Sequence, residues 1–465
     1  MEEVSELIIS LLLSTGFNSF LVKLNKRLKS FISIHLSMNL GYNKVKNLVI
    51  NSLTSFKEYL INHKYSVIAQ FLVFLLSTIL AAEIKLAREL LTIGGQKNDY
   101  AIFYYVSPML FDGRIKYIYD WDYIYYNVSE IMQFRYLPSS LLFFYPLSFM
   151  NLVPSYYLFN TLSFMLTLVS MYFCEKIIME KSDDSSTLFR RRIFFVFFMA
   201  IFHISNYICG QPTSLVLFFM MGSLYAFIKG KEVVGCLLIS VSIMIKPLTY
   251  FIIIFLILSM GGIKEKIKRI IWMVIPLVLD IALFLSVDGL LEGFLARNFG
   301  PTIHPEYGEF PGPNLMSFSL NTLISILFGV PGSYLFIASV AVWVILGWWI
   351  LSRIKDKDKK IIFCFIFGII GFFLCQSFLW AINLIIIYPL LIILSYYIDK
   401  KKRKEYLFIM IIWGITTHLI MHRVNIVMLY VSWVLFLLNV MINFYFIWYA
   451  FKATRVPVEA RVNSP

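Results

Sequence analysis

Long apolar runs, separated by short polar segments, recur along this chain from about residue 66 to about residue 448. Many of these runs are long enough to cross about 30 Å of hydrocarbon as a helix that rises about 1.5 Å per residue. Their apolar residues are continuous rather than alternating, which disfavours a β-barrel. The pattern therefore predicts an all-α polytopic membrane protein with about 12 transmembrane helices.

The composition supports this prediction, because 59% of the 465 residues are hydrophobic and only 15% are charged. A soluble protein of this length could not bury so much apolar surface in one core. The net charge of +14 lies in short clusters between apolar runs, which indicates cytoplasmic loops rather than nucleic-acid binding. The five cysteines form no CxxC or Cys/His cluster, so the sequence predicts neither a disulfide framework nor a metal site.

The basic clusters also assign a side of the membrane to each apolar run, because cytoplasmic loops are enriched in lysine and arginine. Hairpins whose tips lie outside are predicted for residues 193–228 (tip at 209–212), 233–262 (tip at 245–247), 361–398 (tip near 375–383) and 405–448 (tip at 421–425). Single spans are predicted for 66–84, 155–175, 270–287 and 333–352, with a short half-helix at 137–150 that enters the membrane from outside. Two long loops, about 85–136 and 288–332, then lie on the outer face.

The two ends of the chain differ from this apolar region. Acids open the chain where a cleavable signal peptide needs positive charge, so no such signal is predicted. Between Phe17 and Phe31, apolar residues recur at helical spacing among lysines and an arginine. We expect residues 1–64 to be a basic amphipathic extension, on the cytoplasmic membrane face or packed on the bundle. A transmembrane domain is predicted for 65–450 and a cytoplasmic tail for 451–465.

Polar side chains that are unusual for their apolar surroundings fall on the outer side of this topology. Polar groups in membrane segments are costly and commonly functional, although outer loops are also polar simply because they meet water. Lys246 fits the second explanation poorly, because the stretch IMIKPLTYF is apolar on both sides of it. The set comprises Asp99, Arg135, Gln211, Lys246, His304, Glu306, Asn314, Trp380 and Asn383.

The first outer loop is rich in aromatic residues, with FYY at 103–105 and YIYDWDYIYY at 117–126. Such rings suit the membrane interface, and they also suit the C–H faces of sugars. Asp120 and Asp122 have D-x-D spacing without a surrounding nucleotide fold, which indicates a chance match or a pair that contacts a sugar. Asn127 begins a glycosylation sequon on the predicted outer side.

Several short motifs follow one another in a fixed order along these outer segments. They are Asp99 with Phe103, Tyr104 and Tyr105; Gly113 with Tyr119 and Asp120; Tyr136 with Pro138; Gly210-Gln211-Pro212-Thr213; Gly235 through Lys246-Pro247; Asn314 to Ser319; and Ser377, Trp380 and Asn383. Their order resembles glycosyltransferase family 87 and related polyprenyl-phosphate-mannose-dependent mannosyltransferases of the GT-C fold. Asn383 stands where that family often has histidine, and asparagine can bind a sugar hydroxyl but cannot take its proton.

The resemblance implies a membrane hexosyltransferase with its active site on the outer face of the cell membrane. No metal motif is evident in the sequence, and no cofactor is expected. The donor would be a polyprenyl- or dolichyl-phosphate sugar, with mannose favoured, and the acceptor a lipid-linked or other glycan. Transfer would invert the anomeric centre, with Asp99 as the catalytic base. Lys246 and Arg135 would bind the donor phosphate. Contacts to sugar or acceptor would come from Tyr104, Gln211, His304, Asn314, Trp380 and Asn383.

Other interpretations of these residues and of the whole chain remain open. Arg135 could be an interfacial side chain whose charge reaches water, Gln211 could cap its hairpin, and His304 could lie in a flexible lid without touching the chemistry. A transporter or flippase of lipid-linked glycans would need internal repeats or a polar path through the midplane, and neither is evident. A structural membrane protein would show no special sensitivity at Asp99.

Overall fold

The computed structural model describes residues 42–82, 99–127, 134–181, 187–200, 202–299, 302–304, 308–310, 321, 324, 328–329, 332–375, 383–421 and 427–455. The chain divides into two compact units. The first extends to Val73 and includes Ser186–Met199, and the second comprises Phe74–Ser185 and Ala200–Pro465. The amphipathic helix predicted between Phe17 and Phe31 lies outside the described residues.

The first unit is built from helix α3 (Tyr42–Asn62), the first part of α4 (Lys64–Ala81) and α8 (Thr187–Met199). An aromatic cluster holds these helices together at the α3–α4 junction. The His63 ring stacks on Phe194 with centroids 4.7 Å apart and lies 5.0 Å from Tyr59. Helix α8 is thereby joined to the junction by ring contacts, which add to ordinary apolar burial.

The helices show that this is an integral membrane protein. Among the described residues, four helices are long and apolar enough to cross a bilayer, and α8 with α9 (Phe202–Cys209) would make a fifth if they form one broken span. The four are α4, α7 (Leu152–Lys181), α13 (Ile263–Val274) continued through η7 (Ile275–Leu277) and α14 (Val278–Ser286), and α17 (Gly332–Ser352). A total of about 12 crossings stays a prediction.

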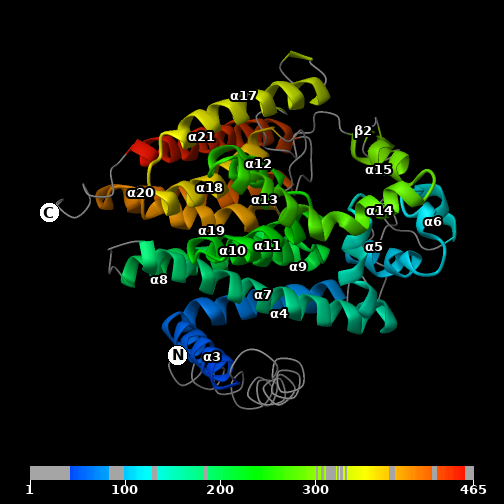
Figure 1. Cartoon of the computed structure of the whole chain (residues 1–465), viewed down its shortest axis with the longest axis horizontal. Helices are drawn as coiled ribbons and strands as arrows, with labels where there is room; N and C mark the ends of the chain where they lie inside the picture. The colour runs from blue at the N-terminus through cyan, green and yellow to red at the C-terminus, as the bar shows by residue number, and fades with distance from the viewer. Residues whose placement is uncertain are drawn as a thin grey trace. The chain divides into compact units, whose positions relative to one another are not determined.

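Buried apolar helices form the core of the second unit. Helices α10 (Thr213–Ile228), α18 (Lys357–Cys375) and α19 (Leu384–Ser395) are buried along almost their whole length. Helix α10 packs against α7, α11 (Glu232–Ile245), α18 and α19, and α18 also packs against α12 (Tyr250–Ser259) (Figure 1). Helices α20 (Arg403–Met421) and α21 (Val427–Arg455) form a pair that follows η9 (Lys400–Lys402).

The helix ends agree with the hairpin tips predicted from the sequence. Helix α9 ends at Cys209 and α10 begins at Thr213, so the turn contains Gly210, Gln211 and Pro212. Helix α11 ends at Ile245 and α12 begins at Tyr250, with Lys246 and Pro247 between them. Glycine at positive φ and proline, which lacks an N–H, are the residues that end helices in this way.

The two segments that are predicted to lie outside contain short elements. The first contains α5 (Asp99–Val106), η3 (Ser107–Leu110), η4 (Ile115–Tyr117) and α6 (Trp121–Asn127). The second contains α15 (Leu290–Phe299) and a hairpin of two short strands, β1 (Thr302–His304) and β2 (Gly308–Phe310), which pair antiparallel. This hairpin is a small departure from the all-α prediction.

The half-helix predicted at 137–150 is wrong in its conformation. The segment forms two 3₁₀ helices, η5 (Pro138–Phe143) and η6 (Tyr145–Phe149), followed by α7. Each 3₁₀ helix has a proline at its first or second position. A proline in mid-segment removes an i→i−4 hydrogen bond and clashes with the preceding turn, which disfavours a continuous α-helix here.

Candidate active site

Four polar side chains from separate segments of the second unit meet at the ends of its helices. Asp99 is the first residue of α5, and Gln211 lies in the turn between α9 and α10. Lys246 follows the last residue of α11, and Asn383 precedes the first residue of α19. All four were candidates from the sequence alone, and the structure brings them together although 284 positions separate the first from the last (383 − 99).

Gln211 is the centre of a hydrogen-bonded network that we call the Asp99–Lys246 network, comprising Asp99, Gln211, Lys246 and Asn383. The Gln211 amide Nε2 donates to the Asp99 carboxylate. The Lys246 ammonium donates to Gln211 Oε1 at 2.9 Å and to Asn383 Oδ1 at 3.1 Å. A single amide therefore links the carboxylate to the ammonium, and each of these two hydrogen bonds involves a charged partner.

Gln211 reaches Asp99 because the turn before it approaches α5 very closely. Gly210 has φ of +63°, and a Cβ at this position would lie 2.5 Å from the Tyr100 Cβ. Only glycine accommodates both this conformation and this contact. Two hydrogen bonds to the Tyr207 carbonyl, at the end of α9, fix the start of this turn. The Tyr156 hydroxyl donates one of them, and the Asn160 amide donates the other at 3.0 Å.

Lys246 lies outside both helices of its hairpin, in the break that Pro247 creates. Its backbone is extended, with φ of −157° and ψ of 124°, as expected for a residue that precedes proline. The side chain is half-buried, and burial lowers the pKa of Lys246 to about 8, although the attraction of Asp99 opposes this shift. The ammonium is therefore protonated near neutral pH and loses its charge in mildly alkaline solution.

Tyr136, which was not among the site residues predicted from the sequence, lies beside this network. Burial raises the pKa of the Tyr136 hydroxyl, the Asp99 carboxylate raises it further, and a hydrogen bond with the Gln211 side chain lowers it. The ring packs against Phe103 with centroids 4.7 Å apart. The signal that could have identified Tyr136 was its position in the Tyr136-x-Pro138 motif.

A buried acid, which was also not among the predicted site residues, fixes the segment that follows Tyr136 in the chain. Asp280 in α14 accepts hydrogen bonds from the Ser139 backbone N–H, at 2.8 Å, and from the Ser139 hydroxyl. The Tyr119 hydroxyl donates to the Tyr136 carbonyl at 2.6 Å, and Arg297 Nε donates to the Tyr119 carbonyl at 2.9 Å. An acid inside the apolar run 275–285 was the available signal, because such a residue needs partners.

The other predicted site residues lie elsewhere or outside the described residues. Arg135 adjoins Tyr136, and its pKa is lowered by burial and by the nearby Arg297. The Tyr104 hydroxyl donates to the Met150 carbonyl at 2.7 Å. His304 ends strand β1 opposite Gly308. Asn314 and Trp380 fall outside the described residues.

The network has the components of a group-transfer site. A carboxylate can accept a proton, an ammonium can bind an anion, and amide groups can orient hydroxyls. Within the described ranges, no group of three or more His, Cys, Asp or Glu side chains is placed to hold a metal.

The chain matches a known protein family over part of its length. The model of glycosyltransferase family 87 matches residues 134–379, which is more than half of the chain. The matched span contains Gln211 and Lys246, whereas Asp99 precedes it and Asn383 follows it. A search of curated proteins gave no match.

Proposed function

This chain belongs to glycosyltransferase family 87, and we propose that it transfers mannose from a polyprenyl-phosphate donor to a lipid-linked or other glycan acceptor. Membership makes the chain a GT-C-like glycosyltransferase. The identity of the sugar, the lipid-phosphate donor and the inverting outcome are parts of the proposal. The observation that supports it most strongly is the hydrogen-bonded link between a carboxylate and an ammonium through Gln211.

In the proposed reaction, an acceptor hydroxyl attacks the anomeric carbon of the donor sugar. The new bond joins the acceptor oxygen to that carbon, the bond from the carbon to the phosphate oxygen breaks, and polyprenyl phosphate leaves with the electron pair. The Asp99 carboxylate takes the proton of the acceptor hydroxyl. A single base opposite the leaving group is the arrangement that inversion requires.

Lys246 is suited to the negative charge that develops on the leaving phosphate. An ammonium has three N–H donors, and Gln211 and Asn383 accept from two of them. The third donor is available for a phosphate oxygen. In a partly buried site such a charge-assisted contact is worth more than in water, and it costs no reorganisation when the reaction occurs.

Gln211 acts as a positioning residue between these two groups. Its amide N–H orients the Asp99 carboxylate, and its carbonyl oxygen orients the Lys246 ammonium. Because one planar group makes both contacts, the base and the phosphate-binding cation keep a fixed relation to each other. Fixed geometry of this kind lowers the entropy cost of bringing donor and acceptor together.

The sidedness of the site belongs to the same proposal. The basic clusters between apolar runs favour a cytoplasmic location for the opposite helix ends, such as the turn at Lys229–Lys231. With that orientation the Asp99–Lys246 network opens to the outer face of the cell membrane. Residues 65–450 would form the catalytic domain, with residues 1–64 as a cytoplasmic or interfacial extension and residues 451–465 as a cytoplasmic tail.

The proposal is tested by donor specificity with the purified protein in liposomes. Three donors would be compared, each together with extracted lipid-linked glycans. Polyprenyl-phosphate-mannose and GDP-mannose would carry radiolabelled mannose, and polyprenyl-phosphate-glucose would carry radiolabelled glucose. We expect label in the glycan from polyprenyl-phosphate-mannose alone, with the anomeric configuration inverted in the product. Equal transfer from GDP-mannose, or retention of configuration, would contradict the proposal.

A further inference from the structure

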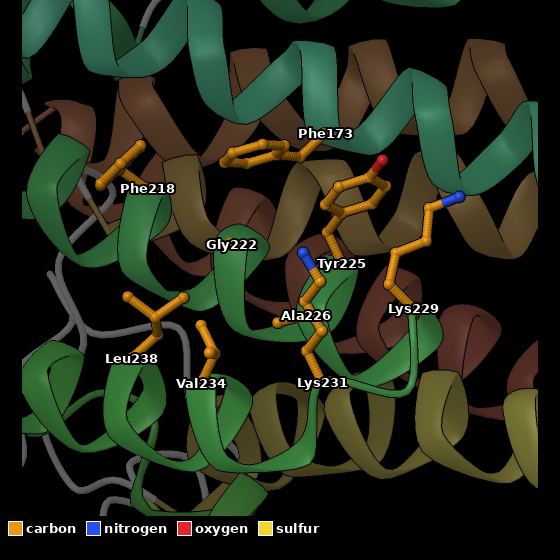
Figure 2. Close-up of a pocket in the computed structure, with 9 residues that line it drawn as sticks. All are labelled: Phe173, Phe218, Gly222, Tyr225, Ala226, Lys229, Lys231, Val234 and Leu238. Atoms are coloured by element: carbon orange, nitrogen blue, oxygen red, sulfur yellow. The ribbon is translucent and has the colours of Figure 1, made fainter. Parts of the chain in front are cut away.

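A pocket lies at the other end of the α10–α11 hairpin from the Asp99–Lys246 network. Helix α10 begins two residues after Gln211, and its last turn leads to Lys229. The pocket has a volume of about 220 Å³ and lies between α7, α10 and α11 (Figure 2). Its lining residues are Phe173, Phe218, Gly222, Tyr225, Ala226, Lys229, Lys231, Val234 and Leu238.

Small residues and aromatic rings give the pocket an apolar interior. Phe173 and Tyr225 stack with ring centroids 5.3 Å apart and form one wall. At Gly222 an added Cβ would lie 3.5 Å from both Leu238 and Phe173, so the absent side chain leaves space between α10 and its neighbours. Water gains little in such a space, which suits an apolar chain better.

The two lysines at the rim of the pocket differ in their partners. Lys229 forms an ion pair with Glu180 of α7, and its ammonium lies 5.6 Å from the centre of the Tyr225 ring. The exposed ammonium of Lys231 makes no ion pair or side-chain hydrogen bond with any residue that the structure describes. Figure 2 shows Lys231 extending back from the turn along the pocket, whereas Lys229 extends toward α7. The rim therefore carries one uncompensated positive charge.

We propose that this pocket binds an anionic membrane phospholipid, with a segment of an acyl chain in the apolar interior and the phosphate against Lys231. The pocket is smaller than the roughly 300–1,000 Å³ of sites that enclose a whole ligand. It would hold part of one chain, and the rest of the lipid would stay in the bilayer. Lysines and tyrosines at the end of an apolar helix lie at the level of lipid headgroups, where anionic lipids attract each basic residue.

Lipid binding by the purified full-length protein tests this site. Native mass spectrometry in detergent would compare phosphatidylglycerol with phosphatidylcholine of the same acyl chains. We expect wild type to prefer phosphatidylglycerol and Lys231→Gln to bind it roughly fivefold more weakly, ~1 kcal/mol. Val234→Phe, at an exposed lining position, should fill the pocket and weaken binding of the lipid. Lys264→Gln removes an exposed lysine outside the pocket and should bind the lipid as wild type does.

The possible outcomes separate a lipid site from the alternatives. Equal binding of the two lipids by wild type, or equal binding of phosphatidylglycerol by wild type and Lys231→Gln, would overturn the proposal. Displacement of bound lipid by inorganic phosphate at the same concentration would show a free-phosphate site instead. Thermal unfolding and sugar transfer by Lys231→Gln should match wild type, because Lys231 lies outside the proposed transfer machinery.

Discussion

Replacing Gln211 by methionine is the sharpest test of the Asp99–Lys246 network, because one side chain holds both charged groups. Methionine has a similar length and flexibility, but it removes both the N–H that donates to Asp99 and the carbonyl oxygen that accepts from Lys246. A hydrogen bond to a charged group contributes about 1.5–3 kcal/mol. Asp99 and Lys246 are half-buried, so water can replace part of the lost interaction.

We therefore expect Gln211→Met to lose about 1.5–3 kcal/mol of transition-state stabilisation, the value of one such bond rather than two. This corresponds to a decrease in kcat/KM of roughly 10- to 150-fold. The measurement is the initial rate of sugar transfer as a function of donor concentration. Both kcat and donor KM should change, because Gln211 positions the base as well as the cation.

Gln70→Met is the control for Gln211→Met, since it makes the same replacement at a buried glutamine of α4. It should leave kcat/KM unchanged provided that the purified protein elutes as wild type does. The reasoning is refuted if folded Gln211→Met transfers sugar within twofold of the wild-type rate, or if Gln70→Met loses as much activity.

Three further predictions follow from neighbouring parts of the site. Because the pKa of Lys246 is lowered to about 8, donor affinity should fall as pH rises through that value. Lys246→Arg should stay charged and lack this fall. A wild-type donor affinity that does not change with pH would contradict the assignment of Lys246 to the donor phosphate. Gly210→Ala should lower the unfolding free energy by about 1–3 kcal/mol through crowding, which a lower unfolding temperature and slower transfer would report. Gly113→Ala, at φ of +81° with nothing within 4 Å of the added Cβ, reports the effect of φ alone. Asp280→Leu should cost about 1–3 kcal/mol in unfolding free energy, because the Ser139 N–H is left unpaired; an unchanged unfolding temperature would show that this contact is not stabilising.

The positions of the helices could be predicted from the sequence because they depend on local properties. The length and apolarity of α7 and α17 are visible in the sequence, and so are the glycine and prolines that end α9 and α11. The 3₁₀ conformation of 138–149 was missed, because apolar residues in a short segment do not distinguish an α-helix from tighter turns.

The geometry of the site could not be predicted because it depends on contacts between distant segments. Gln211 meets Asp99 only because Gly210 permits a close approach to Tyr100, which is 110 positions earlier (210 − 100). The sequence indicated that both Asp99 and Lys246 are unusual, but it could not show that one amide joins them. Asp280 and Tyr136 were overlooked for the same reason, since their partners come from other parts of the chain.

The role of Asp99 as the base is tested most directly by Asp99→Asn, measured for both donor binding and sugar transfer. Asparagine has the same shape and can still accept the Gln211 hydrogen bond, but it cannot take a proton from an acceptor hydroxyl. We predict that donor affinity is retained and that transfer falls by roughly 10²- to 10⁴-fold, the usual contribution of a general base. Transfer by Asp99→Asn at the wild-type rate would contradict the account.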